Sequence, residues 1–121
     1  MQHRSLHTIS AVLEIRNDLK KQNMDKKYFV LHLLPSRPDF AQTMTGEERA
    51  IMMEHIAYWT KLMNEGKVLA FGPVLDPAEI YGLGIISVDD EREVKDLIAN
   101  DPAGKINKYE YFPMEAVVPA K

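Results

Sequence analysis

Most of the chain alternates short apolar runs with helical patterns, in an order that few folds can accommodate. The run YFVLHLL (residues 28–34) is β-branched, aromatic and apolar, and prolines follow it, so it predicts a buried strand. Similar runs predict further strands over residues 67–75, 81–88 and 108–118. Pro113 predicts an edge position or a bulge for part of the last strand, because proline cannot donate a ladder hydrogen bond.

A helix is predicted between the first two of these runs. Thr45 and Glu48 have the spacing of a capping box, in which Thr45 accepts from a backbone amide and Glu48 reaches back. The helix should extend to about Asn64, because Gly66 suits the left-handed position that follows a helix end. The segment PSRPDFAQTM (residues 35–44) before it is predicted to be a loop.

A second helix is predicted to begin at Asp90, with Glu93 three residues on, and to extend to Asn100 before Asp101-Pro102 ends it. The order β-α-β-β-α-β predicts an α+β fold with a four-stranded antiparallel sheet and both helices on one face, the ferredoxin-like arrangement. The other face of the sheet must also be buried. In so short a chain, packing against a second copy is the simplest way to bury it, so we expect a homodimer.

We interpret the N-terminal part of the chain as a peripheral addition to this fold. Apolar residues at near-helical spacing predict an extra amphipathic helix over residues 5–22 and a polar linker over 23–27. We therefore divide the chain into a leader, residues 1–27, and a domain, residues 28–121. A higher assembly through the basic leader is one hypothesis for its role.

Charge and composition exclude several functions. Residues 28–121 carry a net charge of −6 against +3 for residues 1–27, and so acidic a domain is a poor partner for nucleic acid. No run approaches the roughly 18 apolar residues of a membrane span. The chain contains no cysteine, which excludes thiolate metal sites and cysteine nucleophiles. We expect a cytoplasmic protein with neither a nucleic-acid nor a membrane partner.

His55 is the residue whose position invites a functional explanation. Ile51, His55, Tyr58 and Leu62 form a single helical stripe, so the imidazole should point inward. One interpretation is a buried histidine satisfied by a backbone carbonyl. The other is a general base, because histidine has the side chain whose unperturbed pKa, roughly 6.5, lies nearest neutrality.

Asp101 is the best candidate for a partner that orients His55. It shares the inward face of the second helix with Val94 and Leu97. It also lies at the C-terminal end of that helix, where the dipole disfavours a negative charge. The alternative is an ordinary turn aspartate before a proline.

Other residues are weaker candidates for a substrate site. Gly72 and Pro73 predict a stiff corner that presents Asp76, although a plain connecting loop is the better explanation for the first two. Arg37 could hold an anionic substrate, and His32 could face a cavity or pack across strands. We recognise no metal or cofactor motif and expect neither group.

Together these motifs resemble the YCII-related (YciI-like) domain family over residues 28–118. The most specific are the helix histidine followed by Leu62-x3-Gly66, the Gly-Pro-x-x-Asp corner at 72–76, and the Asp-Pro after the second helix. The resemblance implies a ferredoxin-like fold that dimerises into an α+β barrel. It also implies a histidine–aspartate site at His55 and Asp101, with Asp76 as the second choice of aspartate.

The family includes an enzyme that eliminates chloride from a muconate-type intermediate, and its fold is similar to that of muconolactone isomerases. The resemblance therefore implies a cofactor-independent lyase or isomerase, in which a His-Asp dyad acts on a small anionic or carbonyl-containing metabolite. The alternative is a non-catalytic domain that binds a small ligand or another protein.

Overall fold

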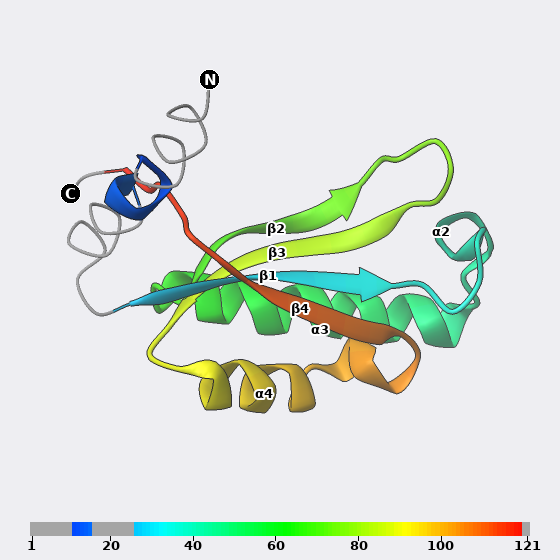
Figure 1. Ribbon diagram of the computed structural model, residues 1–121. Helices are drawn as coiled ribbons and strands as arrows, with labels where there is room; N and C mark the ends of the chain where they lie inside the picture. The colour runs from blue at the N-terminus through cyan, green and yellow to red at the C-terminus, as the bar shows by residue number, and fades with distance from the viewer. Residues whose placement is uncertain (1–10, 16–25, 120–121) are drawn as a thin grey trace, which may run out of the picture.

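The computed structural model describes residues 11–15 and 26–119, and its four strands and two longer helices follow in the predicted order (Figure 1). Strands and helices follow as β1 (Lys27–Leu34), α2 (Phe40–Thr43), α3 (Gly46–Asn64), β2 (Val68–Val74), β3 (Tyr81–Val88), α4 (Glu91–Ala99), the 3-10 helix η1 (Pro102–Lys105) and β4 (Lys108–Met114). The four strands form one antiparallel sheet in the order β2-β3-β1-β4. The predicted α+β class and ferredoxin-like sheet are confirmed.

The molecule has two layers, with α3 and α4 together on one face of the sheet (Figure 1). The side chains of β1 alternate accordingly, and Phe29, Leu31 and Leu33 are buried toward the helices. The centre of the core is formed by nine buried side chains: Phe29, Leu31, Trp59, Leu62, Val68, Ile86, Val88, Val94 and Leu97.

Local signals place the ends of α3. The Thr45 hydroxyl accepts from the Glu48 amide at 3.1 Å, and the Thr45 amide donates to Glu48 Oε1 at 2.9 Å, which is the predicted capping box. After the helix, Gly66 has φ +86°, a conformation that glycine adopts without steric cost. The predicted helix and both of its boundary signals are confirmed.

Two predicted boundaries were wrong. Residues 35–44 are not entirely loop, because Phe40–Thr43 form one helical turn in which Asp39 O accepts from the Gln42 and Thr43 amides. The last strand ends at Met114 rather than Val118, because its partner β1 begins at Lys27 and the pairing stops at Tyr28–Met114. Since β4 lies at a sheet edge, the edge position predicted from Pro113 is confirmed.

The predicted N-terminal helix lies mostly outside the described residues. Within residues 11–15 the chain is helical, and Val12, Leu13 and Ile15 are exposed. No helix in the described part of the chain is long and apolar enough to cross a membrane.

Candidate functional site

The imidazole of His55 contacts the carboxylate of Asp101, 46 residues further along the chain. Its Nδ1 lies 3.0 Å from Asp101 Oδ1 and 2.9 Å from Oδ2. The His55 side chain is 13% exposed and that of Asp101 is fully buried. His55 is held by α3, while Asp101 follows α4, so the packing of both helices on one face of the sheet brings the two groups together.

Asp101 does not occupy the unfavourable helix end that the sequence indicated. Although it follows the C-cap of α4, it is itself the N-cap of η1, and its Oδ1 accepts from the Ala103 amide at 2.9 Å. A carboxylate is a favoured group at that position because it satisfies an amide that has no partner within the helix. The backbone thus orients this carboxylate before any other side chain contributes.

Two further side chains donate to the same carboxylate. The Trp59 indole Nε1 donates to Asp101 Oδ2 at 2.8 Å, and the Tyr109 hydroxyl donates to the same oxygen. Sequence reasoning missed both residues. Trp59 had a signal, because it is four residues after His55 and therefore lies on the same face of α3.

The ionisation states follow from this network. Burial opposes ionisation of Asp101, but its hydrogen bonds, foremost the one from His55, outweigh burial and hold its pKa below the usual value. Burial, together with the neighbouring carboxylate, raises the pKa of the Tyr109 hydroxyl. Asp101 is therefore an anion that accepts, and Tyr109 is a neutral hydroxyl that donates.

An ionised carboxylate can only accept hydrogen bonds, so the His55 nitrogen that faces it, Nδ1, carries a proton. When the ring is neutral, Nε2 is then the basic nitrogen, and no described residue hydrogen-bonds to it. This is the arrangement of a general base whose tautomer is fixed by a neighbouring carboxylate.

A pocket of about 430 Å³ lies beside His55, within the size range of small-molecule sites. It is formed between the sheet, α2 and the middle of α3, and Trp59 and Tyr109 contribute to its wall together with His55. Gly72 and Pro73, which the sequence singled out at the end of β2, also line it.

The other predicted site residues are not among those that line the pocket. The Asp76 carboxylate is exposed and accepts from the Ala78 amide at 2.9 Å, within its own turn. Of the two candidate aspartates, the structure therefore brings Asp101 and not Asp76 to His55. His32 lies on the opposite face of the sheet, with its ring 5.3 Å from that of Tyr81 and 6.1 Å from that of Phe112.

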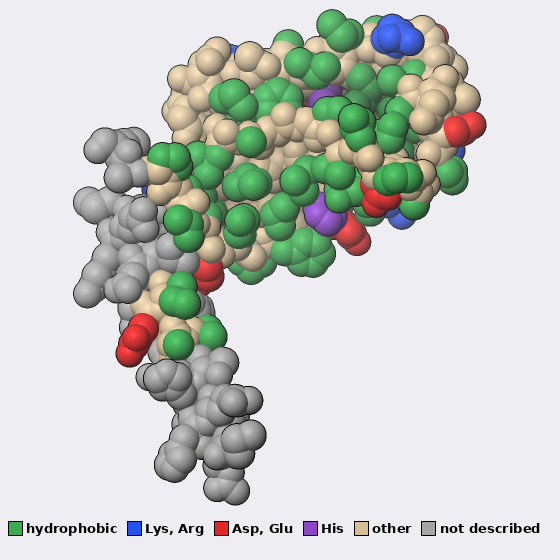
Figure 2. All heavy atoms as spheres, turned by 90° about the horizontal axis from the view of Figure 1, so that it is seen from above, with side chains coloured by type: hydrophobic (Ala, Val, Ile, Leu, Met, Phe, Trp, Pro, Cys, Tyr) green, Lys and Arg blue, Asp and Glu red, His purple; other side chains and the backbone are tan. Residues whose placement is uncertain are grey.

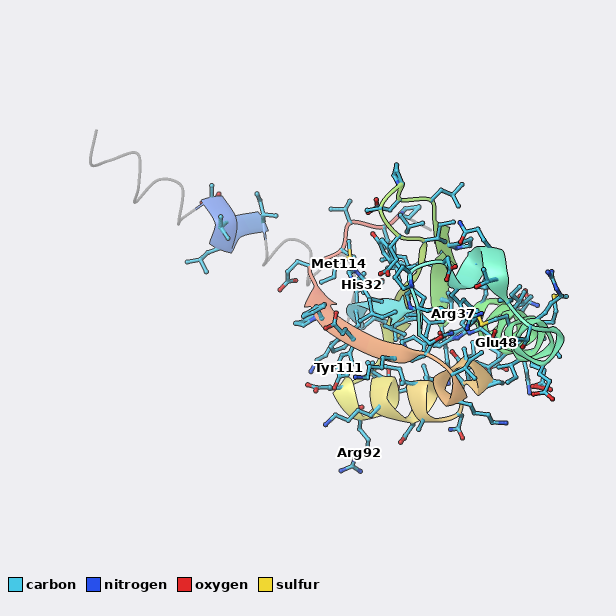
Figure 3. All side chains as sticks on the ribbon, turned by 90° about the vertical axis from the view of Figure 1, so that its right-hand side faces the viewer. His32, Arg37, Glu48, Arg92, Tyr111 and Met114 are labelled. Atoms are coloured by element: carbon cyan, nitrogen blue, oxygen red, sulfur yellow. The ribbon has the colours of Figure 1, made fainter. Side chains whose placement is uncertain are left out.

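Arg37 is held by neighbouring protein groups (Figure 3). Its guanidinium makes two hydrogen bonds to Glu48, of 2.8 and 3.0 Å, and two to the side chain and carbonyl of Thr43. The guanidinium of Arg37 is therefore directed at the first turn of α3. There it contacts Glu48, whose carboxylate also accepts from the Thr45 amide in the capping box.

No group of three or more His, Cys, Asp or Glu side chains in the described part of the chain could hold a metal ion.

The comparisons with known proteins give one match. A family model described as YCII-related domain matches residues 28–115, which is most of the chain and includes both His55 and Asp101. No curated protein matches the chain.

Proposed function

The chain belongs to the YCII-related domain family, and on that basis we propose that it is a small cytoplasmic enzyme of the lyase or isomerase type, with His55 and Asp101 as its acid/base pair. One observation carries the proposal. The imidazole of His55 lines a pocket, and its Nδ1 contacts the fully buried carboxylate of Asp101. A histidine bonded only to backbone and sealed from any pocket would have supported a non-catalytic binding or interaction domain instead.

In the proposed reaction, His55 Nε2 removes a proton from a carbon next to a carbonyl group of the substrate. The Asp101 carboxylate stabilises the imidazolium that forms and holds the ring in place. In an isomerisation the imidazolium returns the proton to another carbon. In an elimination the electron pair of the broken C–H bond forms a double bond and expels a leaving group from the adjacent carbon.

The substrate of this proposal is a small carbonyl-containing metabolite. Gly72 and Pro73 contribute to its binding through the pocket wall. The substrate-binding role predicted for Arg37 is not retained, because Glu48 and Thr43 already hold its guanidinium. Asp76 and His32 are likewise left out, since neither lines the pocket.

Proton exchange in D2O tests the proposal and does not require that the substrate be identified first. The full chain is incubated with a mixture of small carbonyl compounds, and mass spectrometry detects those whose carbon-bound hydrogen is replaced by deuterium. We expect the wild-type protein to accelerate exchange in a subset of compounds, and His55→Gln to abolish that acceleration. Exchange by His55→Gln at the wild-type rate would remove His55 from the chemistry.

Arg92→Gln provides the matched control for this experiment. Arg92 is exposed on α4 and points away from the sheet, so its replacement should leave exchange unchanged (Figure 3). A parallel loss in both variants would indicate damage to the fold rather than to the site.

We further propose that the protein is a homodimer that pairs the uncovered faces of two sheets. Val30 lies opposite Ile85 on β3 and Phe112 on β4, so these apolar side chains share the face away from the helices. Phe112 is 50% exposed and Met114 is 40% exposed. Hydrophobic side chains are spread across this side of the molecule (Figure 2), and a second copy would cover them.

A further inference from the structure

Gly84 lies in the middle of β3, an interior strand of the sheet, where glycine is an unfavourable residue. A left-handed backbone or a β-bulge is a common reason for glycine in a strand. Neither applies here. Among the described glycines Gly66 alone has a positive φ, and the irregularity in β2 lies at Val68–Ala70, opposite Ile85 and Ile86. The conformation of the backbone therefore does not require glycine at this position.

Packing within the sheet does not require it either. A Cβ on Gly84 would lie 3.7 Å from Phe71 Cβ and 4.0 Å from Leu31 Cβ, which are ordinary contact distances. Gly82 differs, because a Cβ there would lie 3.0 Å from Leu33 Cβ, which is too close without a shift. The close approach of β1 thus explains Gly82 and leaves Gly84 unexplained.

The space that Gly84 leaves open belongs to the pocket beside His55. In the sheet Gly84 lies directly opposite Leu31 of β1 and Phe71 of β2, so a side chain on Gly84 would share their face. Leu31 is buried toward the helices, and all three residues line the pocket. The missing side chain therefore enlarges the pocket on its sheet side and lets a ligand approach the backbone of β3.

The wall of this pocket carries no Lys, Arg, Asp or Glu side chain from the described residues. Desolvating a charged ligand group against such a wall is unfavourable unless an opposite charge compensates for it. The carboxylate of Asp101 is not available for this, because it is fully buried and both of its oxygens already accept from the protein. Arg37 is held by Glu48. The pocket therefore favours a ligand without net charge.

We propose that the substrate is an uncharged carbonyl compound with an apolar body, and that Gly84 determines the largest body that the pocket admits. The inference rests on the proposed function in placing the carbonyl group beside His55. It adds the class of substrate and a residue that determines specificity. Because burial of apolar surface favours binding, affinity should increase with the size of the body until the space over Gly84 is filled.

A series of cyclohexanones tests the proposal by binding alone. Cyclohexanone, 4-methylcyclohexanone and 4-tert-butylcyclohexanone share the carbonyl group and differ in the size of the apolar body. Two further ketones are charged. In 4-(trimethylammonio)cyclohexanone a cation replaces the tert-butyl group with nearly the same shape, and 4-oxocyclohexanecarboxylate is an anion. Titration calorimetry with the full-length protein gives the affinities.

We expect the wild-type protein to bind the tert-butyl ketone most tightly and each ion at least about tenfold more weakly. Gly84→Val fills the space over β3. In this variant the affinity for the tert-butyl ketone should fall about tenfold, as in an overpacked site, while that for cyclohexanone stays within about twofold. Since valine is favoured in strands, thermal unfolding should show the variant to be no less stable than wild type.

Gly46→Val is the matched control. Gly46 is exposed in the first turn of α3 and does not line the pocket, and a Cβ there would meet no other part of the described chain within 4 Å. All five affinities should be those of wild type. Equal losses in Gly46→Val and Gly84→Val would deny Gly84 a special place in the site.

Several results would overturn the proposal. Binding of either ion as tightly as the tert-butyl ketone would refute the uncharged substrate. An equal loss of affinity for all three uncharged ketones in Gly84→Val would show that Gly84 does not determine size. Failure of these three ketones to bind wild type would refute the ligand class.

NMR on the wild-type protein replaces Gly84→Val if that variant does not fold. The nine equivalent protons of the bound tert-butyl group should then give nuclear Overhauser effects to the α protons of Gly84. Their absence in the complex would count against the placement of the apolar body.

The two proposals fail separately. The titrations measure binding without turnover, so their failure leaves the proton-exchange test of His55 intact. Loss of the His55 proposal in that test would, in turn, leave the dependence of affinity on ligand size measurable here.

Discussion

The indole of Trp59 donates a 2.8 Å hydrogen bond to the same oxygen of Asp101 that accepts from His55. Because Trp59 follows His55 by one turn of α3, a single helix face presents two donors to one carboxylate. Tyr109, from β4, and the Ala103 amide complete its coordination. Both oxygens of Asp101 are occupied, so its role in the proposed chemistry is to hold His55 and stabilise its charge rather than to exchange protons.

Replacement of Asp101 by Asn should destabilise the protein substantially. The neutral amide cannot accept from all four donors, and it directs its own N–H groups at buried donors. We expect a loss of about 3 kcal/mol in the free energy of unfolding, in the range found when a buried charged network loses one partner. Urea denaturation followed by circular dichroism measures it.

Asp76→Asn is the matched control, because Asp76 is exposed and accepts only within its own turn. We expect it to cost less than about 1 kcal/mol, as most surface substitutions do. Equal losses in Asp101→Asn and Asp76→Asn would contradict the importance assigned to the buried network.

Tyr109→Phe should raise the pKa of Asp101. The variant removes one of the hydrogen bonds that hold this pKa below its usual value and leaves burial, which opposes ionisation, in place. Titration of the Asp101 carboxyl carbon by NMR measures the shift. If the protein has the proposed activity, the pH profile of proton exchange should change with it, which would identify Tyr109 as a positioning residue.

The control for this experiment is Tyr58→Phe. The Tyr58 hydroxyl donates to the backbone oxygen of Leu97 at 2.6 Å and makes no hydrogen bond to Asp101. Both variants lose a partly buried hydroxyl that donates a hydrogen bond, so both should be less stable, but only Tyr109→Phe should raise the pKa of Asp101. An unaltered Asp101 titration in Tyr109→Phe would refute the prediction.

The Arg37–Glu48 pair should make stability depend on pH in the acid range. The hydrogen bond from Arg37, together with the one from the Thr45 amide, lowers the pKa of Glu48 from 4.5 to about 2 in the folded protein. A lowered pKa means that the stabilisation is present above pH 4.5 and is lost as the pH falls toward 2. Glu48→Gln should therefore be less stable than wild type near pH 6, with a difference that narrows steadily below pH 4.5.

Thermal unfolding at a series of pH values measures this difference. Glu47→Gln, the same change one residue earlier on the exposed surface, controls for the loss of a negative charge in the first turn of α3. A gap between wild type and Glu48→Gln that stays constant from pH 6 to pH 2 would show that the pair does not titrate as expected.

The proposed homodimer predicts that Phe112→Glu dissociates the protein. A glutamate on the uncovered sheet face would have to be buried against the second copy, which is unfavourable for an unpaired charge. Light scattering should give wild type twice the monomer mass of 13.8 kDa, and the variant a mass near the monomer's. Met53→Glu places the same change on the exposed surface of α3 and should stay dimeric. A monomeric wild-type protein would end the proposal.

The sequence alone predicts the elements whose signals are local. The Thr45 capping box, Gly66 after α3 and the alternation along β1 involve groups within a few residues of one another, so the pattern of residues suffices to predict them. The inward orientation of His55 could be predicted in the same way, from the helical periodicity of its neighbours. The single turn at Phe40–Thr43 was missed, because an element of four residues is too short to carry a periodic pattern.

What His55 and Asp101 touch is settled by the packing of the elements in three dimensions. Trp59 and Tyr109 reach Asp101 from α3 and β4, and whether such side chains meet depends on how the helices pack on the sheet. Arg37, which the sequence offered as a ligand for substrate, is instead held by Glu48. These contacts follow from the relative positions of whole elements, which the sum of many weak packing interactions sets and no single motif encodes.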